Sequence, residues 1–493
     1  MGIFMLKRTM SVLLLCAIVA STVACGDAAD DSDTTTQDGA TDTATAEVTG
    51  RDAVSDNLPD KDYNGATFTI LNRTGFEYEF TAEETGDVLD DAIYNRNITV
   101  EDRFNIKLET YTVDSNWGDE ATAFNNMLRS SIMAGDGAFD LVAGYAATIP
   151  SIVADGIFMN WNELDYVDFS QPWWSEEIAD ELTINGKTFM MTGDLSLALW
   201  KGMKCIYFNK QLASDYQLGD LYSLVDSGDW TLDKLEELTT NIYEDLDGDG
   251  VKTAGDRYGL LTFGTTAIDS MKEAFEVKVT EKGEDGFPEI VLNNERTIEV
   301  IDNLISYIFD SGFVYMPTDF SEAAEDTELQ MFSDGFGVFL TANLGDAETL
   351  RAMNDDFGIL PYPKYDSNQK SYHSTAHDNL SLFEVPIDAP DPEMTAIITE
   401  ALSAESYKQV IPAFYDIALK TKAARDDDSA AMIDIIRDGL IFDWGYLHSN
   451  ALGGVGHLFV ELIRSNDRNF ASRYDTNSAT YEQKLDEVLE IYR

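Results

Sequence analysis

Apolar and polar residues alternate with two different periods after Pro59. Short runs rich in β-branched and aromatic residues, at 66–71, 105–113 and 139–145, are typical of strands. Between them apolar residues recur every three to four positions, as at Phe124, Leu128 and Ile132, which predicts helices over about 87–103 and 120–135. Strand, helix, strand, helix and strand at this spacing predict parallel βαβ units in an α/β fold.

The segment before Pro59 has no such pattern. Lys7 and Arg8 form a basic start, residues 10–20 are apolar, and residues 21–25 are small, which together predict an export signal over residues 1–24. The apolar run is too short for a membrane-spanning helix. Residues 25–60 are rich in Asp, Thr and Ala, a composition that buries too little apolar surface to fold, so we expect an acidic disordered tether.

Cysteine usage suggests how the chain is held at the cell surface. Cys16 lies in the signal, Cys25 stands at the cleavage junction, and only Cys205 remains in the body, so no internal disulfide is expected. This arrangement resembles a bacterial lipoprotein whose Cys25 is acylated, although Thr22 stands where such signals usually have Leu. The alternative is an ordinary secreted protein with an incidental cysteine.

The stretch DLDGDGVKTAGD, residues 245–256, matches a calcium loop. Oxygen ligands stand at alternating positions and Gly250 permits the sharp turn. A helix over about 230–244 and a strand over 257–263 are expected to flank it, without the paired helix of a sensor, so calcium is predicted to be structural. The alternative is an acidic turn that binds nothing. The expected ligands are Asp245, Asp247, Asp249, Val251, Thr253 and Asp256.

Charge and missing motifs narrow the function. The 493 residues carry a net charge of −57, which argues against nucleic acid and against anionic membranes except through a lipid. No phosphate-binding loop, nucleophile elbow, zinc-protease motif or repeat is present. A binding protein, a secreted carbohydrate-active hydrolase and a surface adhesin therefore remain open, and we expect the first, a non-enzyme.

Several runs occur in an order that resembles a known family. They are DYNGATFTIL, EETGDVLDDAIYNRNITVEDRFNI, FDLVAGY, QPWWSEEI, INGKTFMMTGDLS, YFNKQLASDY and SGDWTLDKLEEL. Over about residues 60–493 the chain resembles the extracellular solute-binding lipoproteins of bacterial ABC transporters, close to family 1, which includes maltose-binding protein. The resemblance implies a monomeric, lipid-anchored receptor on the extracellular face of the cell membrane that delivers a carbohydrate to the permease.

The resemblance also implies a two-lobe, type II periplasmic-binding-protein fold with a three-segment hinge and a ligand cleft between the lobes. The hinge segments would lie near 191–205, 337–341 and 379–385. One lobe would then hold residues 61–193 and 342–379, and the other residues 204–337 and 385–493, including the calcium loop.

Sugar recognition needs aromatic rings for the apolar faces and polar groups for the hydroxyls. Residues of both kinds follow the expected strands and hinge segments. Trp173, Trp174 and Trp230 are expected in the core instead, Cys205 as a buried side chain, and His373, His448 and His457 as structural residues. The expected ligand-binding residues are Arg73, Tyr145, Asp194, Trp200, Asn343, His377, Asp378 and Trp444.

Overall fold

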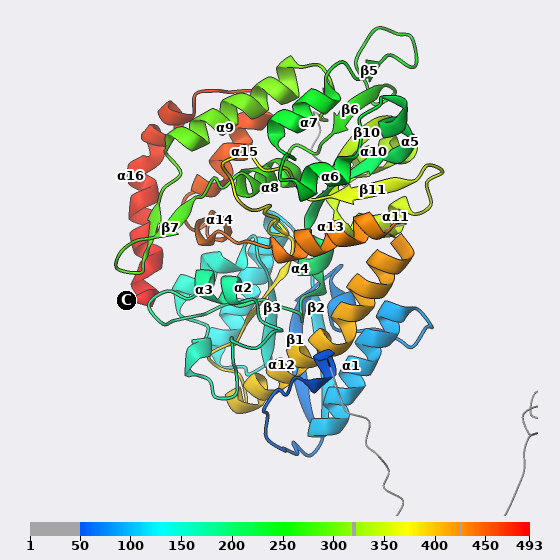
Figure 1. The fold of residues 1–493 in the computed structure, drawn as a ribbon. Coiled ribbons are helices and arrows are strands. Elements are labelled where there is room, and N and C mark those ends of the chain that lie inside the picture. Colours follow the sequence, from blue (N-terminus) through cyan, green and yellow to red (C-terminus); the bar gives the residue numbers. More distant parts are fainter. Residues whose placement is uncertain (1–49, 318–321, 424–425) are drawn as a thin grey trace, which may run out of the picture. The chain divides into compact units, whose positions relative to one another are not determined.

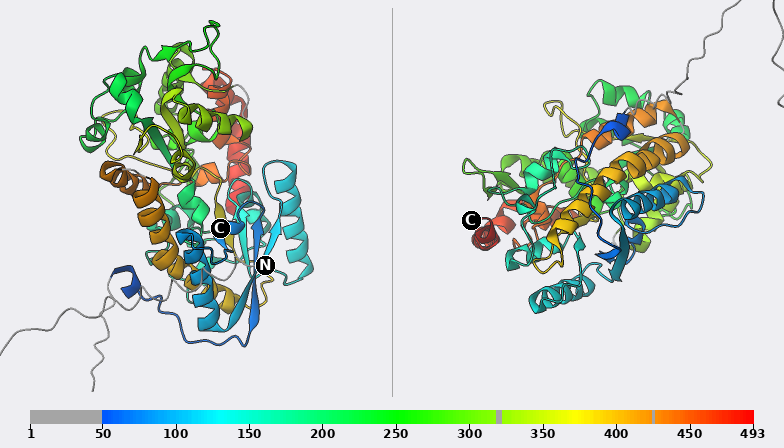
Figure 2. Two further views of the ribbon diagram at one scale, coloured as in Figure 1. Left: turned by 90° about the vertical axis from the view of Figure 1, so that its right-hand side faces the viewer. Right: turned by 90° about the horizontal axis from the view of Figure 1, so that it is seen from below.

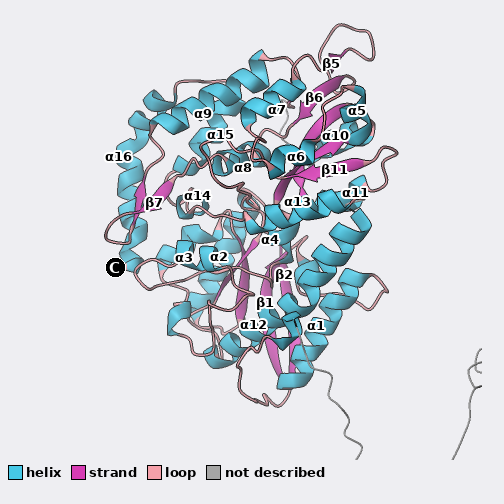
Figure 3. Ribbon diagram, viewed as in Figure 1, coloured by secondary structure: helices cyan, strands magenta, loops and turns pink. Residues whose placement is uncertain are grey.

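The computed structural model describes residues 50–317, 322–423 and 426–493, and Gly50–Arg493 form one compact unit. The expected export signal, Cys25 and most of the expected tether lie outside the described residues. No helix among the described residues is long and apolar enough to cross a membrane. The unit is built on two main sheets flanked by helices, as an α/β fold requires (Figures 1 and 3).

The first sheet has the order β12-β3-β1-β2 among the described residues. β1 is parallel to both β2 and β3, as the βαβ pattern predicts, and β12 is antiparallel to β3. Asp87 begins α1 by accepting a hydrogen bond from Leu89 N, and left-handed Gly135 ends α2. The strands are β1 (Ala66–Arg73), β2 (Ile106–Val113), β3 (Leu141–Tyr145) and β12 (Ser381–Glu384); the helices of this lobe are α1 (Val88–Phe104), α2 (Asp119–Ala134), α3 (Glu176–Leu182) and α12 (Pro392–Glu405).

The second sheet has the order β11-β4-β10-β6-β5, with β9 beside β6. β4 lies inside this sheet and every residue of KCIYFN is buried, which explains the apolar run CIYF at its centre. The strands are β4 (Lys204–Asn209), β5 (Tyr243–Glu244), β6 (Arg257–Leu261), β9 (Val314–Tyr315), β10 (Gly337–Asn343) and β11 (Phe357–Leu360), with the small hairpin β7 (Thr280–Lys282) and β8 (Pro288–Ile290).

Most of the remaining helices belong to the second lobe. They are α5 (Lys210–Asp215), α6 (Leu221–Asp226), α7 (Leu232–Thr239), α8 (Thr266–Ala274), α9 (Glu295–Ile305), α10 (Glu322–Ser333), α11 (Ala347–Leu350), α13 (Asp427–Asp438), α14 (Trp444–Leu447) and α15 (Leu458–Arg464). α4 (Leu197–Lys201) lies in the segment that joins the lobes. α16 (Phe470–Leu489) packs on α9 and α15 in one lobe and on the 149–155 turn of the other (Figures 1 and 2).

The path between the lobes differs from the expected one. The chain crosses before β4, as expected, but the segment expected as the second crossing is β10, a buried strand paired with both β4 and β6. β11 then pairs with β4, so residues 342–360 stay in the second lobe. The assignment of residues 342–379 to the first lobe is therefore wrong for most of that range.

The segment after β12 also differs from expectation. It was assigned to the second lobe, but α12 and the turns after it pack on α1 in the first lobe, because residues 394–404 are mostly apolar or small and all are buried, including Glu400. α13 returns to β11 in the second lobe. The chain end reaches the first lobe again, where Asn185 and Lys187 donate hydrogen bonds to the carbonyls of Tyr492 and Ile491.

Residues 50–60 are part of the folded unit, which corrects the expected end of the tether at residue 60. Arg51 lies over the Tyr407 ring and donates to its carbonyl, and Asp56 pairs with Arg103. These contacts give the segment anchors that its composition alone did not indicate.

Candidate functional site

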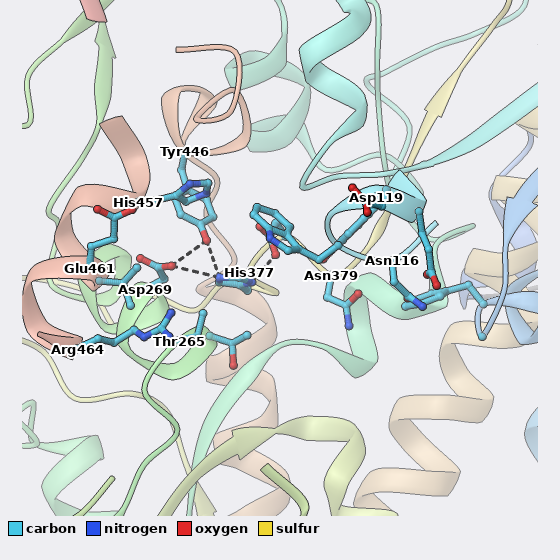
Figure 4. Close-up of a pocket in the computed structure, with 18 of the residues that line it drawn as sticks. Asn116, Asp119, Thr265, Asp269, His377, Asn379, Tyr446, His457, Glu461 and Arg464 are labelled. Carbon is cyan, nitrogen blue, oxygen red and sulfur yellow. Dashed lines mark hydrogen bonds and ion pairs between the residues drawn. The ribbon is translucent and has the colours of Figure 1, made fainter. Parts of the chain in front are cut away.

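A cleft of about 1090 Å³ lies between the two lobes. That size suits an oligosaccharide better than a single small molecule, since typical ligand pockets are roughly 300–1,000 Å³. Figure 4 shows side chains from both lobes projecting toward this space.

The first-lobe wall is made where parallel strands end. The loop after β1 supplies Thr74–Phe76, the loop after β2 supplies Asn116 and Trp117, α2 begins with Asp119 and Glu120, and β3 ends at Tyr145. Ligands of α/β proteins gather at the carboxyl ends of such strands, so this wall follows directly from the sheet topology.

The second-lobe wall comes from α8, α14 and α15. Asp269 lies on α8, Tyr446 on α14, and Glu461 and Arg464 on α15. Asp443 caps α14 by accepting hydrogen bonds from Gly445 N and Tyr446 N, and it also accepts from Thr280 N. This buried cap fixes the short helix and so the direction of Tyr446.

His377 joins the two walls at the base of the cleft. Its Nδ1 lies 2.5 Å from Asp378 Oδ1, and its Nε2 lies 3.4 Å from Asp269 Oδ2 and 2.5 Å from Tyr446 Oη. Tyr446 donates to the same Asp269 oxygen at 3.1 Å (Figure 4). Burial would lower the pKa of His377, but Asp378 and Asp269 together raise it to about 9, so the ring is an imidazolium at neutral pH.

The backbone of His377 is held in an uncommon conformation. Its φ of +57° lies in the left-handed region, which non-glycine residues rarely adopt. His377 N donates to Thr375 Oγ1 at 3.1 Å, which supports the turn. Backbone strain of this kind is concentrated at functional sites, so it agrees with a role for His377 in the cleft.

Arg73 lies directly behind the first-lobe wall and is only 1 % exposed. Its guanidinium carbon lies 3.3 Å from the centre of the Phe76 ring and 4.3 Å from that of Tyr145, and Nη1 donates to Asn379 Oδ1. Burial lowers the pKa of Arg73, and the nearby Tyr145 and Glu79 oppose the change. Arg73 therefore positions three lining residues without facing the cleft itself.

Aromatic side chains meet across the cleft. Trp117 from the first lobe is 58 % exposed, and its ring contacts His457 of the second lobe edge-on at 5.9 Å between centres. His457 in turn contacts Tyr446, and Tyr446 contacts His377. Exposed rings at a cleft can stack on the apolar faces of sugars.

Solved structures with the same fold come from sugar-binding proteins. An ABC substrate-binding protein from Listeria monocytogenes in complex with cycloalternan is 14 % identical, with a TM-score of 0.52 over 87 % of this chain and 99 % of that one. The maltose/maltodextrin-binding domain from Bdellovibrio bacteriovorus bound to maltotriose is 14 % identical, with a TM-score of 0.53 over 85 % and 100 %. The GacH receptor of Streptomyces glaucescens, solved unliganded and with acarbose, is 12 % identical, with a TM-score of 0.54 over 85 % and 99 %.

This chain has the substrate-binding-protein fold. The two-lobe, type II architecture expected from the sequence is thereby confirmed. No family model matches the sequence, and the search of curated proteins found no match either.

The structure brings only part of the expected ligand-binding set to the cleft of this substrate-binding fold. Tyr145, His377 and Asp378 line it, and Arg73 supports it from behind. Asn343 does not line the cleft but is linked to it through Lys204. Its Oδ1 accepts a hydrogen bond from Lys204 Nζ, which also donates to the lining residue Thr266.

Three expected ligand-binding residues lie elsewhere. Asp194 is buried, and burial raises its pKa to about 8 although Arg51, Trp200 and Arg437 oppose the rise. Trp200 is buried edge-on against Tyr415. Trp444 is also buried and stacks on His448 at 3.8 Å. Asp194 was expected at the cleft because it follows an expected strand, and Trp200 because it lies in the first expected hinge segment. Both side chains instead face the core of the substrate-binding fold.

Other expectations about single residues are met by the structure, with one exception. Trp173 and Trp174 are buried and donate their indole N–H groups to the two oxygens of Glu400, and Cys205 is buried and free. His457, expected as a structural residue, lines the cleft instead. Its position beside Gly-rich turns, in NALGGVGH, was the available signal.

The acidic loop lies far along the second lobe, between β5 and β6, which pair as a hairpin. The expected helix before the loop is shorter than predicted, because α7 ends at Thr239. Asp245, Asp247 and Asp249 are exposed, and oxygens of all three lie within 4.8 Å of one another. Asp256 is buried and instead accepts hydrogen bonds from Leu246 N and Thr253 N.

Proposed function

We propose that this chain captures an oligosaccharide outside the cell and delivers it to an ABC permease. One observation carries the proposal: a cleft of about 1090 Å³ lies between two lobes of the substrate-binding fold and is lined from both. Its walls combine the rings of Tyr145 and Trp117 with the hydrogen-bonding groups of Asn116, Asp378 and Asn379, which is the mixture that a pyranose requires. Solved structures with this fold carry maltotriose, cycloalternan and acarbose.

A saccharide that touches both walls favours the closed arrangement of the lobes, because it gains contacts there that an open cleft does not offer. A permease can then distinguish loaded from empty protein by shape. His377 and Asp378 lie where the segments joining the lobes meet the cleft. A ligand that contacts them can therefore influence the angle between the lobes.

The proposal favours binding over hydrolysis. A glycosidase needs one cleft carboxyl that is protonated near neutral pH. Although burial acts to raise the pKa of Asp378, the imidazolium of His377 lowers it overall, so this group is a poor proton donor. Asp378 therefore does not suit the role of that acid, which favours a binding protein over the alternative of a carbohydrate-active hydrolase.

Equilibrium dialysis against a labelled oligosaccharide library tests the proposal. We expect saturable binding of at least one oligosaccharide, with the ligand recovered at its original length. Tyr145→Ala should abolish binding, whereas Trp174→Phe, which alters a ring outside the cleft, should leave the affinity unchanged. Shortened products, or no binding by any saccharide, would refute the proposal.

We further propose that Cys25 carries a lipid that anchors the protein to the membrane. The support is the export signal and the cysteine at its junction. Cys25→Ala should release the protein into the medium, whereas Cys205→Ala should not change its location. Detergent partitioning distinguishes the two variants, and equal partitioning of both would refute the anchor.

Calcium in the acidic loop is also proposed, as a structural ion. The residues fit in part: three carboxylates converge, and this convergence with Asp256 nearby raises the pKa of Asp247 in spite of the lowering effect of its hydrogen bond with Asp249 N. When bound, the ion would neutralise this repulsion. Asp245, Asp247 and Asp249 would hold it, while Asp256 fastens the loop backbone.

A further inference from the structure

Building on the proposed function, we propose that the cleft selects saccharides that carry a basic amino group over neutral ones and rejects acidic ones. Five carboxylates line the cleft, from Asp119, Glu120, Asp269, Asp378 and Glu461. The imidazolium of His377 and the guanidinium of Arg464 are the cations that face them. The cleft therefore presents an excess of negative charge from both walls.

The carboxylates differ in how far they are already neutralised. Asp378 is paired with His377 at 2.5 Å, and Glu461 lies 3.8 Å from Arg473. Asp119 and Glu120 are exposed and have no hydrogen bond or ion pair with any other described residue. Two charges on the first-lobe wall are therefore free to act on a ligand.

Asp269 supplies the most specific observation. Its side chain is 2 % exposed and lines the cleft, and Oδ2 is shared by His377 and Tyr446. Oδ1 is buried and has no hydrogen-bond partner within the part of the chain that the structure describes. A buried, unpaired carboxylate oxygen is costly, and a ligand ammonium group would satisfy it with a charge-assisted hydrogen bond.

The same geometry opposes an acidic saccharide. Carboxylates already surround the imidazolium of His377: Nδ1 lies 2.5 Å from Asp378 and Nε2 lies 3.4 Å from Asp269, so a ligand carboxylate would have to compete with both. Arg73 gives its guanidinium to Asn379 and the carbonyl of Leu380 behind the wall. The negative potential of an acidic cleft adds to this exclusion at a distance.

An array of oligosaccharides in matched sets tests the inference with the full chain. Each set holds one backbone in neutral form, with one hydroxyl replaced by an amine, and with one hydroxymethyl oxidised to a carboxylate. At about pH 6 the amine is protonated. We expect about tenfold tighter binding of the amine than of its neutral parent, since a hydrogen bond between charged groups is stronger than one between neutral groups. We expect no binding of the acid.

Variants assign the effect to the cleft. Asp119→Asn with Glu120→Gln should reduce the amine preference and its dependence on salt, and Asp269→Asn should remove most of it. Glu83→Gln with Glu84→Gln, two exposed residues outside the cleft, should leave the preference unchanged. If Asp269→Asn does not fold, the exposed pair Asp119→Asn with Glu120→Gln still tests the inference.

The outcomes separate this inference from the proposed function. The charge selection alone would be overturned if acidic saccharides bound with an affinity equal to or higher than that of their neutral parents. It would also be overturned if the preference for the amine survived all cleft variants. A complete lack of saccharide binding would overturn the proposed function with it.

Discussion

Two groups of carboxylates, one in the cleft and one in the acidic loop, have opposite surroundings. In the cleft, Asp269 and Asp378 are buried and both face the imidazolium of His377. In the acidic loop, Asp245, Asp247 and Asp249 are exposed and face one another, with only backbone N–H groups as partners. The first group has a cation of the protein between its members, although Asp269 Oδ1 stays unpaired, whereas the second gathers charges with no cation between them. The difference shows that a cluster of acidic residues suits ligand recognition when the fold places a cation between them, and suits metal binding when it does not.

The largest expected effect comes from removing the imidazolium of His377. His377→Gln takes away the cation that lies between the buried Asp269 and Asp378, so the free energy of unfolding should fall by about 3–5 kcal/mol. Urea denaturation at pH 7 measures it. His373→Gln is the matched control: its ring lies 3.3 Å from Glu276 at a more exposed site, and we expect a loss below about 1 kcal/mol. Equal losses in the two variants would contradict the role given to His377.

The loop should respond to an ion where the cleft does not. Calcium at a hundredfold excess over its Kd should raise the free energy of unfolding by about 2.7 kcal/mol, and a chelator should reverse the gain. Asp245→Asn with Asp249→Asn should abolish the response, whereas Glu83→Gln with Glu84→Gln should keep it. Thermal unfolding with and without chelator decides the matter, and a response that survives the loop variant would place the ion elsewhere.

Calcium should leave ligand affinity nearly unchanged, because the loop does not line the cleft. Calorimetric titration of a bound saccharide, with and without chelator, checks this separation. A large loss of affinity on chelation would show that the loop and the cleft act as one site.

The stability of the cleft group should depend on pH through His377. The pKa of His377 is raised from 6.5 to about 9 in the folded state, so its contribution to the free energy of unfolding is fully present below pH 6.5 and is lost as the pH rises through about 9. The loss should reach at most about 3 kcal/mol, at 1.36 kcal/mol per pKa unit. Other groups also make stability depend on pH, such as Glu400, whose buried carboxyl has a pKa of about 8. Subtracting the pH profile of His377→Gln from that of the parent removes the pH dependence that both proteins share. Identical pH profiles would contradict the imidazolium assignment.

The smallest effect concerns Asp256, which belongs to the loop but is buried like the cleft carboxylates. Asp256→Asn should lower the free energy of unfolding by about 1 kcal/mol without calcium, because one backbone hydrogen bond is lost. Its effect on calcium affinity should be smaller than that of the Asp245 and Asp249 pair. A larger effect would make Asp256 a direct ligand, as the loop spacing predicts.

Sequence reasoning predicted one residue of the first-lobe wall, Tyr145, because strand ends are local features, and it missed the loops after β1 and β2. Tyr145 follows a clear strand, and the parallel order places that strand end beside those of β1 and β2. The second-lobe wall was mostly missed, because Tyr446 lies on a four-residue helix and depends on a cap from Asp443 to the distant Thr280. Trp444, two residues earlier, was expected instead because the family resemblance implies a stacking aromatic in a late glycine-containing loop, but its side chain is buried. β10 was taken for a crossing because a buried strand and a hinge segment look alike in an apolar run.

The central claim is that the cleft closes on a saccharide held by both lobes. Small-angle X-ray scattering of the protein with a saturating oligosaccharide tests this claim most directly. We predict that the radius of gyration falls on binding and that the fall is lost in Tyr145→Ala, which removes a first-lobe contact, at saccharide concentrations that saturate the parent. A saturated complex with an unchanged radius of gyration would contradict the account.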